Sequence, residues 1–156
     1  MLRRVVVLLL TLLAADATAQ AVTVTLTVTN ADALMQDATL DDYANGYIIG
    51  VTPVSYTVTL AGSQSVCATV QLRGAAAAGS DHGLSDVQWG LTAASQPMTL
   101  TTAAADVSSH HLTNSSRTDT GVIYLRKSNL AWSDGPKTYL GPDLIFDVSA
   151  RRASAC

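Results

Sequence analysis

The side chains that could do chemistry in this chain are few: twelve acids, all of them Asp, three His and two Cys. Ser80, Asp81 and His82 have the residue types of a catalytic triad, but they are neighbours in sequence and cannot face one another as a triad requires. A mechanism with two carboxylates would have to use Asp alone, and no spacing singles out a pair. The sequence therefore predicts a protein that is not an enzyme, with an Asp-based secreted hydrolase as one alternative.

The histidines give no pattern that is typical of a metal site. His110 and His111 are adjacent, so on a strand they point to opposite faces and cannot chelate one ion together. Residues 41–46 partly match a calcium loop, but Tyr43 stands where an oxygen ligand is needed and the chain has no Glu. Asn45-Gly46 within this segment favours a turn instead. We expect no metal and no cofactor.

Three aromatic residues are candidates for a ligand-binding surface: Trp132, Tyr43 and Tyr47. Trp132 lies just before a predicted turn, and the two tyrosines flank another. An exposed ring offers apolar area beside polar groups, which suits stacking on a sugar. These residues predict, as a second interpretation, a carbohydrate-binding module.

Residues 1–19 have the parts of a cleaved signal peptide: a basic start at Arg3 and Arg4, an apolar run over residues 5–15, and small residues at the cleavage site. The apolar run is too short to span a bilayer as a helix. The sequence predicts a chain that is exported to the periplasm, the cell surface or the medium, begins near Gln20, and has no membrane span.

The composition of residues 20–156 is typical of one all-β domain. The whole chain has a net charge of −3 and only nine basic residues, which argues against binding to nucleic acid or to anionic membranes. Glu is absent and Lys is scarce, whereas Thr and Val are abundant, so strands are favoured over helices. About seven to nine short alternating segments predict a single antiparallel sandwich.

The alternation of apolar and polar residues is clearest in residues 54–60 and 66–73. A short connection separates them, and they predict a hairpin. A further strand places Val87, Trp89 and Leu91 on one face, so we expect Trp89 in the core rather than at a ligand.

The first segment of the mature chain, residues 21–30, alternates Val and Leu with Thr. It could be an ordinary first strand, a strand donated to a neighbour, or a threonine face that binds a regular surface. The rest of the chain already offers enough strands for a sandwich, so we expect this strand to fold onto its own domain.

Cys67 and Cys156 are the two cysteines of the chain. An even number of cysteines in an exported protein favours a disulfide. Cys67 lies on the polar face of its predicted strand, where the C-terminal tail could reach it. Free thiols or a bridge between two chains are the alternatives.

Residues 130–150, "LAWSDGPKTYLGPDLIFDVSA", resemble the closing part of exported bacterial immunoglobulin-like domains of the fimbrial-subunit and spore-coat-U type. The resemblance implies an immunoglobulin-like sandwich that is exported for surface or filament assembly. The chain departs from the pattern in its Gly-Pro order and in its final residues. The residues that carry the resemblance are Trp132, Asp134, Gly135, Pro136, Tyr139, Phe146 and Val148.

Together these features predict a secreted or surface-exposed structural or adhesive module without catalysis. An acidic all-β domain of this kind would meet a protein partner, a surface glycan or a second copy of itself through strand edges and loops.

Overall fold

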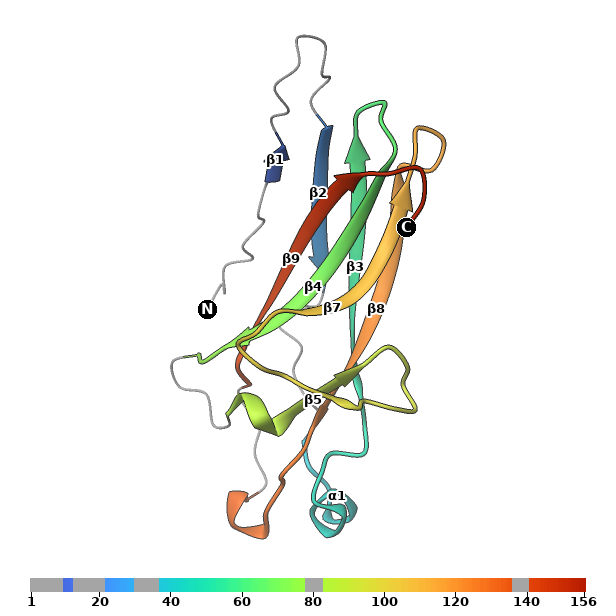
Figure 1. The fold of residues 1–156 in the computed structure, drawn as a ribbon. Coiled ribbons are helices and arrows are strands. Elements are labelled where there is room, and N and C mark those ends of the chain that lie inside the picture. The colour runs from blue at the N-terminus through green and yellow to red at the C-terminus, as the bar shows by residue number, and fades with distance from the viewer. Residues whose placement is uncertain (1–9, 13–21, 30–36, 78–82, 136–140) are drawn as a thin grey trace.

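The computed structural model describes residues 10–12, 22–29, 37–77, 83–135 and 141–156. They form two antiparallel sheets packed face to face (Figure 1). One sheet has the order β1-β2-β3-β8-β5-β6 and the other the order β7-β4-β9. Apart from β1 there are eight strands, which confirms the predicted all-β sandwich. The strands are β1 (Leu10–Leu12), β2 (Val22–Thr29), β3 (Thr52–Ala61), β4 (Val66–Ala75), β5 (Val87–Gly90), β6 (Met98–Thr99), β7 (Ala105–Leu112), β8 (Thr118–Lys127) and β9 (Asp143–Arg152).

The first long strand, β2, lies in the sheet of its own chain. It pairs with β3 from Thr23 opposite Ala61 to Thr29 opposite Ser55, as the sequence predicts. The short β1 pairs with the start of β2, with Leu12 opposite Val22. Because β1 falls within the predicted signal peptide and most of that segment lies outside the described residues, cleavage after residue 19 stays a prediction.

The core lies between the two sheets and follows the predicted alternation. Val54, Tyr56 and Val58 of β3 are buried, and Val66, Ala68, Val70 and Leu72 of β4 face them across the core. Their side chains form one continuous apolar cluster that also includes residues of β2, β5, β7, β8 and β9. Two layers with their apolar faces together are the expected way to bury alternating strands.

Trp89 is buried in this core beside Val87, as predicted, but the prediction for Leu91 is wrong. Leu91 is 55% exposed. Its strand ends at Gly90, whose backbone packs against the backbone of Ser95 and Gln96. Because the strand ends one residue before Leu91, the alternation that would turn Leu91 inward no longer applies to it.

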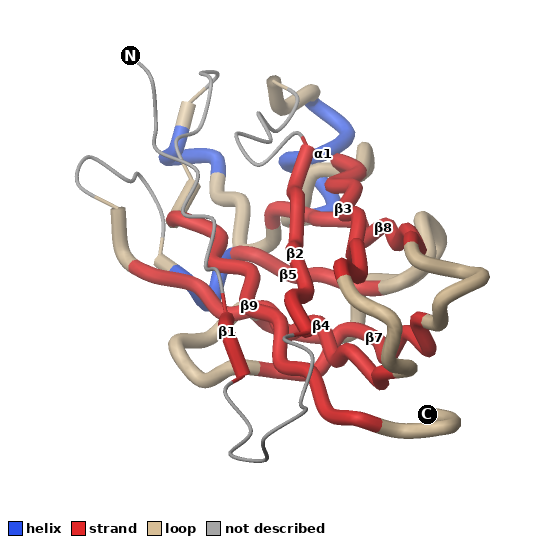
Figure 2. Tube along the Cα trace, turned by 90° about the horizontal axis from the view of Figure 1, so that it is seen from above, coloured by secondary structure: helices blue, strands red, loops and turns tan. Residues whose placement is uncertain are grey.

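The predicted hairpin of residues 54–60 and 66–73 is also wrong. β3 and β4 are consecutive in sequence, but they lie in different sheets. The connection passes through Gly62, whose φ is 136°, and carries the chain from one layer to the other, as Figure 2 shows from a second direction. Alternation gives both strands one apolar face. It does not say whether those faces lie side by side or opposite each other.

The predicted disulfide is present. Cys67 and Cys156 are bonded, with their Cα atoms 5.3 Å apart and a sequence separation of 89. Cys67 lies opposite Arg151 of β9 in the sheet, so the chain needs only a short turn after β9 to bring the last residue back. The bond covers Cys67, which is why a residue on the outer face is buried.

Within the described residues, three short helices lie outside the sandwich: α1 (Leu40–Asn45) and the 3-10 turns η1 (Leu84–Asp86) and η2 (Trp132–Asp134). Asn45-Gly46, predicted as a turn between strands, is instead the end of α1. Gly46 adopts φ 75° and closes the helix in the left-handed conformation. None of the helices in the described part of the chain is long and apolar enough to cross a membrane.

Candidate functional site

The end of the molecule that carries α1 holds the aromatic residues predicted from the sequence. Trp132 stacks on Tyr43 with 5.1 Å between ring centroids and 21° between ring planes. The Tyr43 hydroxyl donates a hydrogen bond to the Gly135 carbonyl, which fixes the lower ring. Tyr43 is buried, whereas Trp132 is 65% exposed. The indole therefore presents one supported, flat face to solvent.

A helix cap holds Tyr43 in place. The Asp42 carboxylate accepts hydrogen bonds of 2.7 Å from the backbone N–H and hydroxyl of Thr39 and one of 2.6 Å from the Ile49 N–H. Burial opposes ionisation of Asp42, but these hydrogen bonds prevail and lower its pKa below the ordinary Asp value. Backbone bonds from Leu130 to Gly46 and from Ile48 to Lys127 then tie α1 to the segment that precedes η2.

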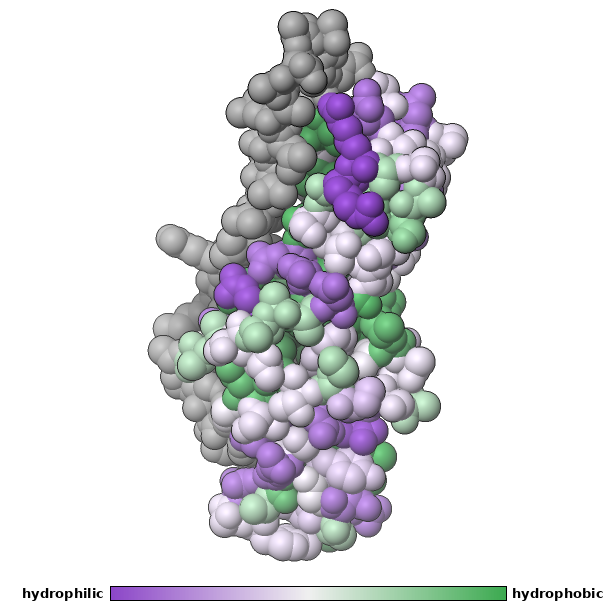
Figure 3. Space-filling model, viewed as in Figure 1, coloured by the Kyte–Doolittle hydropathy of each residue, from purple (hydrophilic) through white to green (hydrophobic). Residues whose placement is uncertain are grey.

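Tyr47 has a different neighbour. The guanidinium carbon of Arg126 lies 4.7 Å from the centre of the Tyr47 ring, a cation–π contact. In the described part of the chain the three predicted aromatic residues thus form two pairs, Trp132 with Tyr43 and Tyr47 with Arg126, and not one cluster. We call these four residues the aromatic end. Figure 3 shows hydrophilic and hydrophobic residues interspersed over one face of the molecule, without a single large apolar patch on that face.

The second surface feature is the edge of the three-stranded sheet formed by β9. β9 pairs with β4 along its whole length, from Asp143 opposite Ala75 to Arg152 opposite Val66. On its other side it lies near β2, but no ladder joins these two strands among the described residues. A ten-residue strand with one unpaired side is a template for strand addition.

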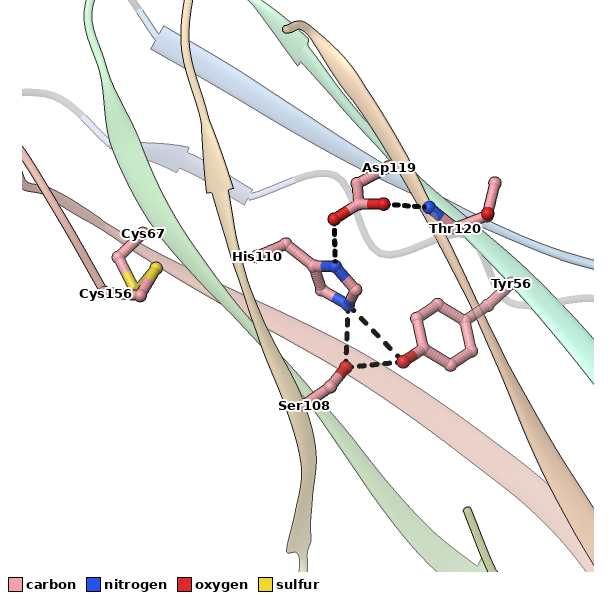
Figure 4. Close-up of polar contacts among 7 residues, drawn as sticks. All are labelled: Tyr56, Cys67, Ser108, His110, Asp119, Thr120 and Cys156. Atoms are coloured by element: carbon pink, nitrogen blue, oxygen red, sulfur yellow. Dashed lines mark hydrogen bonds and ion pairs between the residues drawn. A yellow bond between two sulfur atoms is a disulfide. The ribbon is translucent and has the colours of Figure 1, made fainter. Parts of the chain in front are cut away.

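A third feature joins the two sheets through hydrogen-bonded side chains (Figure 4). On β7, Ser108 Oγ lies 2.7 Å from His110 Nε2. His110 Nδ1 lies 2.8 Å from a carboxylate oxygen of Asp119 on β8. Tyr56 of β3 places its hydroxyl 2.5 Å from Ser108 Oγ and 3.4 Å from His110 Nε2. We call these four residues the polar seam.

The polar seam lies where both sheets have an edge among the described strands. β7 pairs only with β4, and β5 pairs with β8 only from Tyr124 to Lys127, which leaves Thr118–Ile123 unpaired on that side. A β-bulge shapes β7 at this point: Val70 pairs with Ser108 and Gln71 with Asp106, so Val107 is an extra residue. The bulge lets Val107 and the next residue, Ser108, both turn toward the other sheet.

The donor and acceptor roles in the polar seam follow from the hydrogen-bonding capacity of each group. A carboxylate only accepts, so Nδ1 of His110 carries the hydrogen toward Asp119, and in the neutral imidazole Nε2 is then free to accept from the Ser108 hydroxyl. The hydrogen bond from His110, and then that from the Thr120 N–H, lower the pKa of Asp119 below its ordinary value. Burial raises the pKa of Tyr56, which therefore stays protonated and donates to Ser108.

The sequence did not point to this grouping. The three sequence neighbours with the residue types of a triad, Ser80, Asp81 and His82, lie outside the described residues. As expected, His110 and His111 point to opposite faces, and His110 is buried while His111 is exposed. The available signal was the spacing of Ser108 and His110, which puts both on one face of a strand, but it does not identify an Asp on another strand.

Five other Asp side chains of the described regions have hydrogen-bond or ion-pair partners within the fold. Among the described residues no group of three or more His, Cys, Asp or Glu could hold a metal ion. The structural partners are Thr39 for Asp42, the Gly83 N–H for Asp86, Gln71 for Asp106, the Ala131 N–H for Asp134 and Arg73 for Asp147.

Comparison with known proteins adds no relative: no family model matches the chain, and neither a curated protein nor a solved structure does.

Proposed function

We propose that this protein is an exported, surface-exposed β-sandwich with a structural or adhesive role, which associates with a second copy of itself along β9. Among the described strands, β9 has a ladder partner on one side only, and this open edge is the observation that carries the proposal. Such an edge binds another strand through backbone hydrogen bonds, with little demand on side-chain identity. The disulfide supports export, because disulfides persist in oxidising compartments.

The charges along β9 favour a second copy as the partner. The strand begins at Asp143 and ends at Arg151 and Arg152, both of which are exposed. If two β9 strands pair antiparallel about a two-fold axis, the acidic start of one lies beside the basic end of the other. Opposite charges across paired strands are stabilising, and like charges are destabilising. An isologous contact of this kind closes into a dimer with one continuous sheet.

Light scattering on the mature chain, residues 20–156, tests this association. We expect a dimer that the double variant Arg151→Glu, Arg152→Glu converts to a monomer, because the charges along β9 are then acidic at both ends. Arg117→Glu is the matched control, since Arg117 is exposed in the loop between β7 and β8. A wild-type chain that stays monomeric at high concentration, or a dimer that survives the double variant, contradicts the proposal.

A carbohydrate-binding module is the second candidate function, and the exposed indole of Trp132 favours it. Aromatic rings that bind sugars need a free face and a fixed orientation. Trp132 has a free face because it is exposed, and its orientation is fixed by the Tyr43 ring on which it stacks. The guanidinium of Arg126 at the same end supplies a cation that suits an acidic sugar.

A glycan array separates the two candidates. Retention of one polysaccharide that is lost in Trp132→Ala and kept in Leu91→Ala supports the binding module, because Leu91 is an exposed apolar residue of a different loop. Silence across the array together with a β9-dependent dimer supports the structural role.

A further inference from the structure

The polar seam has two of the three geometric elements of a nucleophilic active site. Its serine hydroxyl is in hydrogen-bond contact with a histidine nitrogen at 2.7 Å, and the other nitrogen of that ring is held by a carboxylate at 2.8 Å. Such triads are recognised by geometry and by the role of each nitrogen, not by sequence order or fold. Here Ser108 and His110 come from one strand and Asp119 from the strand opposite.

The third element is a donor for the negative charge that develops on an attacked carbonyl. The Tyr56 hydroxyl lies 2.5 Å from Ser108 Oγ, and its raised pKa keeps it protonated. A side-chain hydroxyl can fill this role in place of backbone N–H groups. Tyr56 can reach Ser108 because its ring crosses the position of Gly121, where any side chain would collide with it.

Solvent can approach the seam from the open side of the sandwich. The Asp119 side chain is 54% exposed, and His110 is 8% exposed behind it. Ser108 is partly exposed, whereas Val107 beside it belongs to the core. Ser108 thus lies at the boundary between solvent and the apolar interior. Phe146 is on the interior side, and its ring centroid is 6.2 Å from that of Tyr56.

We propose that Ser108 is a nucleophile activated by His110, and that it accepts acyl groups from small uncharged esters. Ser108 Oγ attacks the carbonyl carbon and gives its proton to Nε2 of His110. The bond to the alcohol breaks as His110 returns that proton to the leaving oxygen. Water then attacks the acyl-serine by the same route and releases the acid. Asp119 is the positioning residue that fixes the imidazole tautomer.

The surroundings limit the substrate to a short, uncharged acyl group. The Asp119 carboxylate would repel an anionic ester, and the apolar side of the seam disfavours any charged one. Ser108 is only partly exposed and His110 is buried beside it, so a short acyl chain is easier to place there than a bulky one. Acetyl and butyryl esters meet both limits.

A fluorophosphonate probe that reacts with activated serines tests the proposal on the intact, disulfide-bonded protein. Mass spectrometry should find one adduct per chain, located at Ser108. Ser108→Ala should abolish the adduct, and His110→Gln should slow it by at least about 100-fold, the usual contribution of a general base. The matched controls Ser109→Ala and His111→Gln alter the exposed neighbours on the outer face of β7 and should label at the wild-type rate.

The role of Asp119 needs a variant that separates positioning from folding. Asp119→Asn should slow labelling, and Asp119→Glu should restore it in part, while circular dichroism stays unchanged in both. Hydrolysis of 4-nitrophenyl acetate should follow the same order of variants. Absence of any adduct in the natively folded wild-type chain overturns the proposal without the need for a variant, as does an adduct that persists in Ser108→Ala. Neither result affects the association through β9, which uses other residues.

Discussion

The ring of Tyr56 lies directly across the backbone of Gly121. The two residues are partners in the pairing of β3 with β8, and a Cβ atom at position 121 would collide with the hydroxyl and ring carbons of Tyr56. The missing side chain gives the tyrosine a path over its neighbouring strand to the far sheet. There its hydroxyl meets Ser108. The glycine thus decides whether Tyr56 can take part in the polar seam.

Gly121→Ala should therefore lower stability, since Tyr56 cannot withdraw without leaving the seam. We expect a loss of about 1–3 kcal/mol, typical of overpacking in a core, measured by urea denaturation. Thr120→Ala is the exposed control on the same strand and should change stability by less than about 0.5 kcal/mol. If the clash is the cause, the added cost of Gly121→Ala should nearly vanish in a Tyr56→Ala background; equal costs in both backgrounds would refute it.

Asp119 should make stability sensitive to acid. Its pKa is lower in the fold than in the unfolded chain, mainly through the hydrogen bond from His110. The ionised carboxylate therefore stabilises the protein above the unfolded value of about 4, and this contribution is lost as the pH falls through the lower folded value. The stability difference between wild type and Asp119→Asn should be largest near neutral pH and shrink below about pH 4. The pKa of Asp42 is also lowered, but Asp42 is present in both proteins, so its contribution cancels in the stability difference between them. Parallel stability curves from pH 3 to 7 would contradict this role.

Removal of the disulfide should cost much of the stability of the domain. The bond between Cys67 and Cys156 closes a loop with a sequence separation of 89, for which the chain-entropy relation gives about 4–5 kcal/mol. Thermal unfolding of the Cys67→Ala, Cys156→Ala variant should show this loss, and reduction of the wild type should reproduce it. An unchanged unfolding midpoint after verified reduction would show that the bond does not constrain the chain.

The cap of α1 should control the aromatic end. Asp42→Ala removes the acceptor for Thr39 and Ile49, with an expected cost of about 1–2 kcal/mol. The near-ultraviolet circular dichroism of the stacked Trp132 and Tyr43 should weaken as the helix loosens. Asp41→Ala, on the exposed side of the same turn, should leave that signal intact. Equal spectra for both variants would mean that the stack forms without the cap.

The sequence was a good guide wherever strand alternation decided the structure. The inward residues of β2, β3 and β4 could be read from their spacing, and Cys67 could be paired with Cys156 because only two cysteines exist. The same pattern could not place β3 and β4 in different sheets. Alternation determines which face of a strand is apolar, whereas the choice of sheet depends on which strands meet in three dimensions.

The candidate sites were less predictable, for a similar reason. Trp132 and Tyr43 were identified as aromatic candidates, but their stacking depends on a contact between segments 89 positions apart. The polar seam combines residues of β3, β7 and β8, and its geometry requires a bulge at Val107 and a glycine at position 121. Buried Lys127, whose pKa is lowered by burial, likewise had no sequence signal. Such features arise from tertiary packing and produce no periodic pattern in the amino-acid sequence.

Hydrogen exchange of the β9 amides at low and high protein concentration tests the central proposal most directly. Amides of residues 144–152 that point away from β4 have no ladder partner among the described strands, so they should exchange fast in dilute solution. If a second copy adds its own β9, these amides should become protected as concentration rises, while β7, the other edge of the same sheet, should not change. Exchange along β9 that stays the same while the protein goes from dilute to concentrated would contradict association through this strand.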